Sequence, residues 1–162
     1  MCSSDLDEYP NWRKLNKMKK NDSYRMVKQE LILRFFAFYY DFESYSGSLA
    51  SYLNDFMEKY RFADDNKLSE MSHIFRNTVD SFYDAYIDGN FKHNISITLQ
   101  DAISVGIARN LTRVINDGKI NTQIRMKQII DDSLFSESAL AEGLAKKQRL
   151  IDRLNRACEI MR

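Results

Sequence analysis

Glycine and proline are scarce in this sequence, and their scarcity limits the folds open to it. The chain has five glycines and one proline in 162 residues. Sheets and long loops use these residues at their turns, whereas helices joined by short connections need few of them. The chain is also 44% hydrophobic and 12% aromatic, so a complete apolar core can form. We therefore expect an all-α protein, a single orthogonal bundle of six to seven helices.

Helical spacing of apolar residues and turn signals indicate where these helices lie. The expected elements are a short helix from Pro10 to about Lys17, a long one from the cap cluster at 21–23 to about Phe42, one over 49–60, one between the loop 63–66 and Gly89, one from Asn94 or Ser96 to Gly118, a shorter one ending near Phe135, and a last one over 138–161.

Two of these helices carry unusual features. The helix ending near Phe42 is apolar around most of its girth, so we expect it to be central to the fold. Gly106 lies inside the helix that ends at Gly118, where a glycine costs roughly 1 kcal/mol relative to alanine. A close helix crossing at Gly106 would explain why it is there.

Arg34 lies beside the apolar stripe of the long helix, and two carboxylates are candidates to pair with it. Glu30 precedes it by four residues, the favourable order for an intrahelical pair. Asp101 lies between Leu99 and Ala102 near the start of a strongly apolar helix. Asp101 could pair with Arg34 in the core, or it could be a surface residue near a helix cap. The sequence does not decide between these two.

Positive charge is concentrated near the two ends of the chain. Residues 11–34 hold eight Lys or Arg against two Asp or Glu, and residues 146–162 hold six against two. A helical wheel of the last helix places four cations on one side, opposite an apolar side made of Leu140, Leu144, Ile151, Leu154 and Cys158. We expect this basic stripe to face water, as candidate phosphate contacts or as an ordinary solvated face. Its members are Lys146, Arg149, Arg153 and Arg156.

No pattern in the sequence indicates a catalytic, cofactor or metal site. The two histidines, His73 and His93, are isolated, and neither has a second ligand at metal-binding spacing. The adjacent carboxylates 64–65 and 131–132 have no sign of converging. No apolar run is long enough to cross a membrane, there is no signal peptide, and the two cysteines lie at opposite ends. We expect no cofactor, no membrane contact and a cytoplasmic, reducing location.

The first six residues, Met-Cys-Ser-Ser-Asp-Leu, match no structural pattern. A common sequencing adapter can encode most of this run, and the alternative is an ordinary frayed terminus. We expect residues 1–6 to be a non-native leader and residues 7–162 to form a single helical domain, a fragment of a longer protein.

Several motifs, in order, resemble the helical C-terminal region of the GmrSD-type restriction endonuclease subunit family. The resemblance covers roughly residues 12–160. It is carried by Arg25, the run Glu30-Leu31-Ile32-Leu33-Arg34-Phe35-Phe36-Ala37-Phe38, Gly47, Leu53-Asn54-Asp55-Phe56-Met57, Phe75, Phe82, Phe91, Asn94, Leu99-Gln100-Asp101-Ala102-Ile103, Phe135, Arg153-Leu154 and Ala157.

The resemblance implies a role in modification-dependent (type IV) restriction and anti-phage defence. Full members of the family begin with a ParB-like domain marked by a D-G-Q-Q-R motif, and some end with an HNH-type nuclease domain. This sequence has neither, so no catalytic residue can be carried over to it. We expect an accessory domain that supports or regulates the absent ParB-like domain, with that domain and the DNA backbone as candidate partners. The alternatives are an interaction module without nucleic-acid contact and, less favoured, an independent enzyme.

Overall fold

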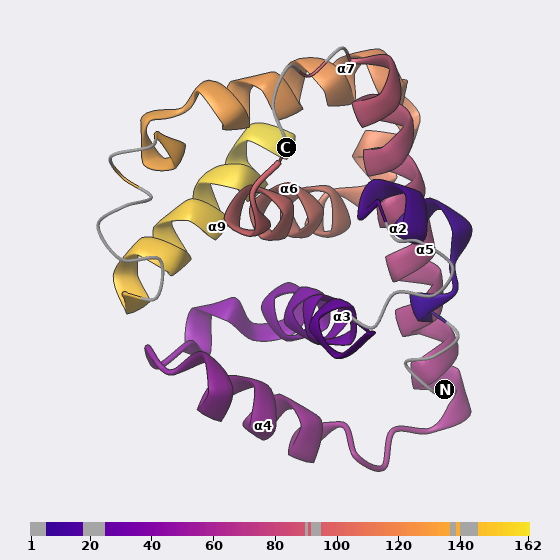
Figure 1. Ribbon diagram of the computed structural model, residues 1–162, viewed down its shortest axis with the longest axis vertical. Coiled ribbons are helices and arrows are strands. Elements are labelled where there is room, and N and C mark those ends of the chain that lie inside the picture. Colours follow the sequence, from indigo (N-terminus) through magenta and orange to yellow (C-terminus); the bar gives the residue numbers. More distant parts are fainter. Residues whose placement is uncertain (1–5, 18–24, 90, 92–94, 137–138, 140–145) are drawn as a thin grey trace.

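The computed structural model describes residues 6–17, 25–89, 91, 95–136, 139 and 146–162 (Figure 1). Over these ranges the chain is all-α and has no strand, which confirms the predicted fold class. The elements are α2 (Pro10–Leu15), α3 (Arg25–Asp41), the 3-10 helix η1 (Phe42–Ser44), α4 (Leu49–Lys59), α5 (Asp65–Asp88), α6 (Ile97–Arg109), α7 (Leu111–Asp131), the 3-10 helix η2 (Ser133–Phe135) and α9 (Lys147–Met161).

Short polar side chains begin three of these helices. Ser48, Asp64 and Ser96 each precede a helix, and each side-chain oxygen accepts a hydrogen bond from the backbone N–H three residues later. Such caps satisfy backbone donors that the first helical turn leaves without partners. Of the two residues predicted to cap α6, Ser96 does so, and Asn94 lies outside the described residues. The same is true of the predicted cap cluster at 21–23.

The centre of the fold is α6, which packs against α3, α5, α7 and α9. Seven successive residues, Ala102–Ala108, are buried, so this helix is covered on all sides. Figure 1 shows α6 in the middle of the molecule, with α3 below it and α7 above it. The predicted stripe of α3 is buried as well, but α3 covers one side of α6 and does not itself occupy the centre.

The close crossing predicted at Gly106 is present, and α9 is the helix that makes it. A Cβ atom added to Gly106 would lie 2.9 Å from the carbonyl oxygen of Ala157 and 3.0 Å from Cγ of Met161. Only a residue without a side chain lets the two backbones approach this closely. The cost of a glycine in a helix is therefore offset here by packing.

The prediction of one continuous helix up to Gly118 is wrong, because the chain breaks at Asn110 between α6 and α7. Asn110 has φ −120° and ψ 24°, outside the helical range. Its side-chain amide donates to the carbonyl oxygens of Gly106 at 2.9 Å and Cys158 at 3.0 Å. An asparagine that bonds to nearby backbone groups competes with the helix. Apolar spacing continues across the break, so hydrophobicity does not reveal it.

Gly118 divides α7 into two helical stretches, so a helix ends at Gly118 as predicted, although that helix begins after the break at Asn110. Its φ of 77° and ψ of 176° lie in a region that is essentially restricted to glycine. A Cβ atom there would meet nothing within 4 Å. The kink therefore requires glycine because of its backbone conformation, and not because a side chain would clash with a neighbouring atom.

Gly118→Ala is expected to lower the free energy of unfolding by about 1–2 kcal/mol. Alanine would have to adopt a strained backbone conformation at this position, and its methyl group would make no new contact that offsets the strain. Chemical denaturation of the variant and the wild type measures this difference. Asn116→Ala, at an exposed position of the same helix, serves as the control. A Gly118→Ala protein as stable as the control would show that the kink is not a fixed part of the fold.

The described residues reach both ends of the expected domain. Leu6 is buried in the core, whereas residues 1–5 lie outside the described part, so the predicted leader 1–6 stays a prediction. The last helix starts at Lys147; residues 138 and 140–145, predicted to extend it, are outside the described ranges. None of the described helices combines the length and the apolar character that crossing a membrane requires.

Candidate functional site

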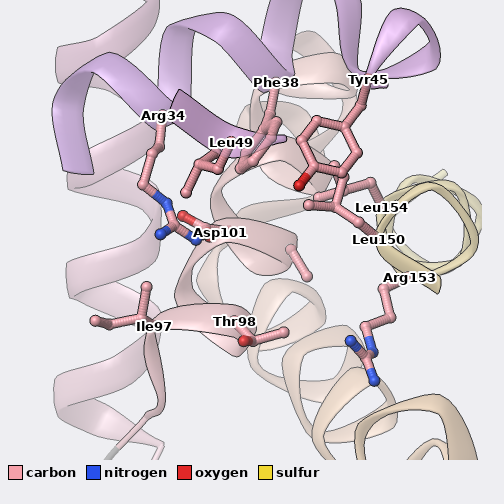
Figure 2. Close-up of a pocket in the computed structure, with 11 residues that line it drawn as sticks. Arg34, Phe38, Tyr45, Leu49, Ile97, Thr98, Asp101, Leu150, Arg153 and Leu154 are labelled. Carbon is pink, nitrogen blue, oxygen red and sulfur yellow. Dashed lines mark hydrogen bonds and ion pairs between the residues drawn. The ribbon is translucent and has the colours of Figure 1, made fainter. Parts of the chain in front are cut away.

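A cavity of about 210 Å³ lies where α3, α6 and α9 meet, next to the start of α4. Figure 2 shows its walls: Arg34 comes from α3, Asp101 from α6, and Leu150 and Leu154 from α9. Most of the lining is apolar, and five side chains bring polar groups to it. The lining residues are Arg34, Phe38, Tyr45, Leu49, Ile97, Thr98, Asp101, Ala102, Leu150, Arg153 and Leu154.

Arg34 and Asp101 form an ion pair at one side of this cavity, so the core alternative for Asp101 is the correct one. One terminal nitrogen of Arg34 donates a short hydrogen bond to Oδ2 of Asp101. The Asp101 side chain is only 11% exposed. Glu30 lies further out, with its Oε1 3.9 Å from the other terminal nitrogen of Arg34. Arg34 thus links the two predicted carboxylates, one buried and one exposed.

Burial makes the Asp101 carboxyl an unusually weak acid. Loss of solvation, with a smaller contribution from the charge of Glu30, raises the pKa of Asp101 from 3.8 to about 6. The neighbouring guanidinium of Arg34 opposes this shift without cancelling it. The Nε atom of Arg34 is itself buried and has no hydrogen-bond partner. The Arg34–Asp101 pair therefore keeps one N–H donor, at Nε of Arg34, without a hydrogen bond.

The prediction that Arg153 faces water is wrong. Arg153 is only 3% exposed and lies on the packed side of α9. Its Nε donates to the carbonyl oxygen of Leu134 at 2.9 Å, and its Nη2 donates to that of Ala139 at 2.7 Å. Its Nη1 is buried without a partner. Burial lowers the pKa of Arg153, and the nearby charge of Arg149 lowers it further.

The other three cations of the predicted stripe have different surroundings. Lys146 is exposed, as predicted, but it is the N-cap residue of α9 and does not lie within the helix. Arg149 is half-buried, and its Nη1 lies 3.4 Å from the carbonyl oxygen of Ala139. Arg156 is exposed but paired, with its Nε 2.8 Å from Asp132 and its Nη1 3.3 Å from Glu159. The stripe is therefore not a continuous row of cations facing solvent.

Helix register explains this error. The sequence interpretation counts Leu140 and Leu144 as part of the apolar side, although α9 begins only at Lys147. Within α9, Arg153 follows Leu150 by three residues and precedes Ala157 by four, and such residues share a helix face. That face is the packed one, so Arg153 points into the protein.

The described residues hold no arrangement typical of a catalytic or metal centre. No group of three or more His, Cys, Asp or Glu side chains among them could hold a metal ion. His73 is exposed on α5, and His93 lies outside the described ranges. Burial raises the pKa of Cys158 to about 11, which leaves its thiol a poor nucleophile.

The two adjacent carboxylate pairs singled out in the sequence contribute to helix ends. Asp64 caps α5 by accepting from the Lys67 backbone N–H at 2.8 Å. Asp132 accepts from the backbone N–H of Leu134 at 3.0 Å while its other oxygen binds Arg156. Helix capping and the ion pair with Arg156 therefore explain one carboxylate of each adjacent pair, Asp64 and Asp132, without a catalytic role.

One exposed feature of α7 was missed in the sequence. Ile120 is 66% exposed and Ile124 is 51% exposed. They are four residues apart and share a helix face. Ile124 also borders an open groove between α7 and α9, lined by Lys127, Gln128, Asp131, Asp132, Arg156 and Ile160. We call Ile120, Ile124 and this groove the α7 surface.

Comparisons of the chain with protein-family models, with curated proteins and with solved structures found no match. The resemblance to the GmrSD-type family therefore stays a prediction from the sequence.

Proposed function

We propose that this chain is a non-catalytic helical domain of a cytoplasmic, GmrSD-type restriction protein and that it docks against the ParB-like domain of the same parent protein. Two lines of reasoning support this. The ordered motifs of the chain resemble the region that follows the ParB-like domain in that family. In addition, the residues at which the resemblance is strongest, such as Arg34, Phe38 and Asp101, line the cavity between helices and hold the fold together.

The α7 surface is the observation that carries the docking proposal. Ile120 and Ile124 are both exposed and lie on one helix face, and an exposed apolar patch rimmed by polar residues marks an interaction site. The charged residues Lys127, Asp131 and Arg156 surround the apolar part of the groove. An apolar centre with a polar rim is the usual composition of an interface between protein domains. The ParB-like domain is the occupant to which the family resemblance points.

A double variant tests this docking. Ile120→Asp with Ile124→Asp should abolish binding to the separately expressed ParB-like domain in a calorimetric titration, because charges would be buried at the centre of the interface. Ile87→Asp is the matched control, since Ile87 is 57% exposed on another helix, α5. Equal affinities for the wild type and the double variant would exclude the α7 surface as the docking site.

The family assignment has a simpler test of its own. In genomic DNA, an in-frame D-G-Q-Q-R motif upstream of the codon for residue 7 is the expected finding. A stop codon directly upstream would contradict both the family assignment and the idea of a fragment.

A contact with the DNA backbone is the secondary part of the proposal, supported by the exposure of Lys146 and Arg156. Each phosphate contact adds about 0.9 to the log–log salt slope of duplex binding. Lys146→Gln, Arg149→Gln and Arg156→Gln together should lower the slope by at most about 3. Arg153 is left intact because it holds backbone carbonyls. Fluorescence titrations at several salt concentrations measure the slope. An unchanged slope would favour an interaction module without nucleic-acid contact.

A further inference from the structure

Asp101 brings a carboxylate oxygen that lacks a hydrogen bond to the cavity between α3, α6 and α9. Its Oδ2 accepts from Arg34, whereas no donor among the described residues bonds to its Oδ1. The Asp101 side chain is 11% exposed, and Oδ1, unlike Nε of Arg34, is not a fully buried atom. Figure 2 shows the carboxylate reaching from α6 toward Arg34, among the side chains that line the cavity. A molecule in the cavity can therefore reach Oδ1 as an acceptor.

The charges around Oδ1 favour a neutral ligand. Arg34 already compensates the charge of Asp101, so an ammonium group would meet the guanidinium of Arg34 and lose its own solvation. A ligand carboxylate would meet the negative charge of Asp101. A neutral N–H or O–H group avoids both costs and gives Oδ1 the donor that it lacks. A molecule without such a group would displace solvent from Oδ1 and leave this acceptor unsatisfied, which is costly.

The size and the walls of the cavity limit the shape of such a ligand. The cavity volume is about 210 Å³. A cavity of about 150 Å³ lined by apolar side chains accommodates benzene, so this one has room for an aromatic ring and a small substituent or fused ring. Leu49, Leu150 and Leu154 supply an apolar wall against which a ring would pack. Ile97 also lines the cavity and is exposed, so the cavity opens to solvent on that side.

We propose that this cavity binds a small neutral aromatic molecule that carries one N–H or O–H group, such as an indole or a phenol. The N–H or O–H group donates to Oδ1 of Asp101, and the ring packs among the three leucines. The apolar walls contribute most of the affinity, and the single hydrogen bond contributes the selectivity. The proposal does not depend on docking at the α7 surface, which is formed by other residues.

Indole is the probe for this proposal, and it is titrated into the intact chain by isothermal calorimetry. Saturable binding to one site is expected. Benzofuran has the same shape with an oxygen atom in place of the N–H group. It should bind about ten to a hundred times more weakly, because it cannot donate to the charged carboxylate. Equal binding of indole and benzofuran, or no binding of indole at millimolar concentration, would overturn the proposal.

The double variant Arg34→Met with Asp101→Leu tests whether Asp101 is the acceptor. It removes the carboxylate without leaving a charge buried, so the chain should stay folded. Indole should then bind no more tightly than benzofuran, while the affinity for benzofuran should not fall. A preference for indole that survives in the double variant would show that another group accepts the hydrogen bond. A loss of both affinities together would show that the ion pair only shapes the cavity, and would contradict the hydrogen bond as well.

A second variant tests the place of the ring. Leu150→Phe keeps Asp101 and fills the cavity, so it should abolish the binding of indole. Ile160→Phe is the matched control, because Ile160 is also half-buried on α9 but borders the other groove. Retained affinity in a folded Leu150→Phe protein would place the ligand elsewhere and refute the site.

Discussion

Replacing Asp101 with alanine is expected to lower the free energy of unfolding by about 3 kcal/mol or more. The substitution leaves the guanidinium of Arg34 largely buried with only the distant carboxylate of Glu30 as a partner. Breaking a buried pair by removing one partner typically costs about 3–5 kcal/mol. Because the side chain of Arg34 stays partly exposed, we expect the loss of unfolding free energy to lie at the lower end of this range. Urea denaturation followed by circular dichroism measures it.

The double variant Arg34→Met with Asp101→Leu separates the cost of an orphaned charge from the value of the pair. It buries no charge and keeps similar volume, so its stability should lie near that of the wild type. A control at the surface is Lys59→Met with Asp41→Leu, which removes a pair whose side chains are 61% and 45% exposed. If Asp101→Ala is no less stable than the wild type, the Arg34–Asp101 contact does not contribute to the fold as described.

The stability that Asp101 contributes should also depend on pH. Its pKa is about 6 in the folded protein, against 3.8 for an unperturbed carboxyl. The folded state therefore holds the proton more tightly than the unfolded state. The resulting stabilisation is complete below about pH 4 and is lost as the pH rises through about 6. Relative to Asp101→Asn, which cannot titrate there, the wild type should lose stability over this window and change little above pH 7.

Enlarging Gly106 is the second change with a large expected effect. Gly106→Ala should cost about 1–2 kcal/mol and Gly106→Val about 3 kcal/mol, even though alanine is the better helix former. The added Cβ atom would meet the backbone of Ala157, which cannot move without shifting α9. Thermal and chemical unfolding of the two variants should show this graded loss.

A helical position without a close crossing provides the control for Gly106. Asn116→Ala followed by Asn116→Val measures what a β-branched residue costs at an exposed site. If Gly106→Ala instead stabilises the protein by about the helix-propensity difference, the backbones of α6 and α9 are further apart than the structure places them.

The positions of most helices could be predicted because they depend on local signals. Ser96 and Asp64 are typical caps, and the apolar spacing of residues such as Phe75 and Phe82 repeats at the helical period. The break at Asn110 could not be predicted in this way. It depends on the carbonyl group of Cys158, forty-eight residues away, which the side chain of Asn110 reaches only in the folded protein.

The candidate site was predictable to a similar extent. A single arginine beside an apolar stripe indicates a buried pair, and Asp101 was one of two carboxylates considered for it. Arg153 was misplaced, because its burial depends on where α9 begins and on the carbonyl groups of Leu134 and Ala139. Both acceptors come before the first residue of α9, so a helical wheel of α9 cannot place them beside Arg153. The exposed isoleucines could not be recognised, since an apolar residue at helical spacing usually indicates the core.

The crossing of α6 and α9 has a consequence for synthesis of the protein on the ribosome. A nascent chain that has emerged only through η2 can form α3, α5 and α6, but the side of α6 around Gly106 then has no cover. That side is apolar and would be exposed to other chains until α9 arrives. The core is therefore completed only after synthesis of α9, and a chaperone that shields nascent helices would act on this domain during that interval.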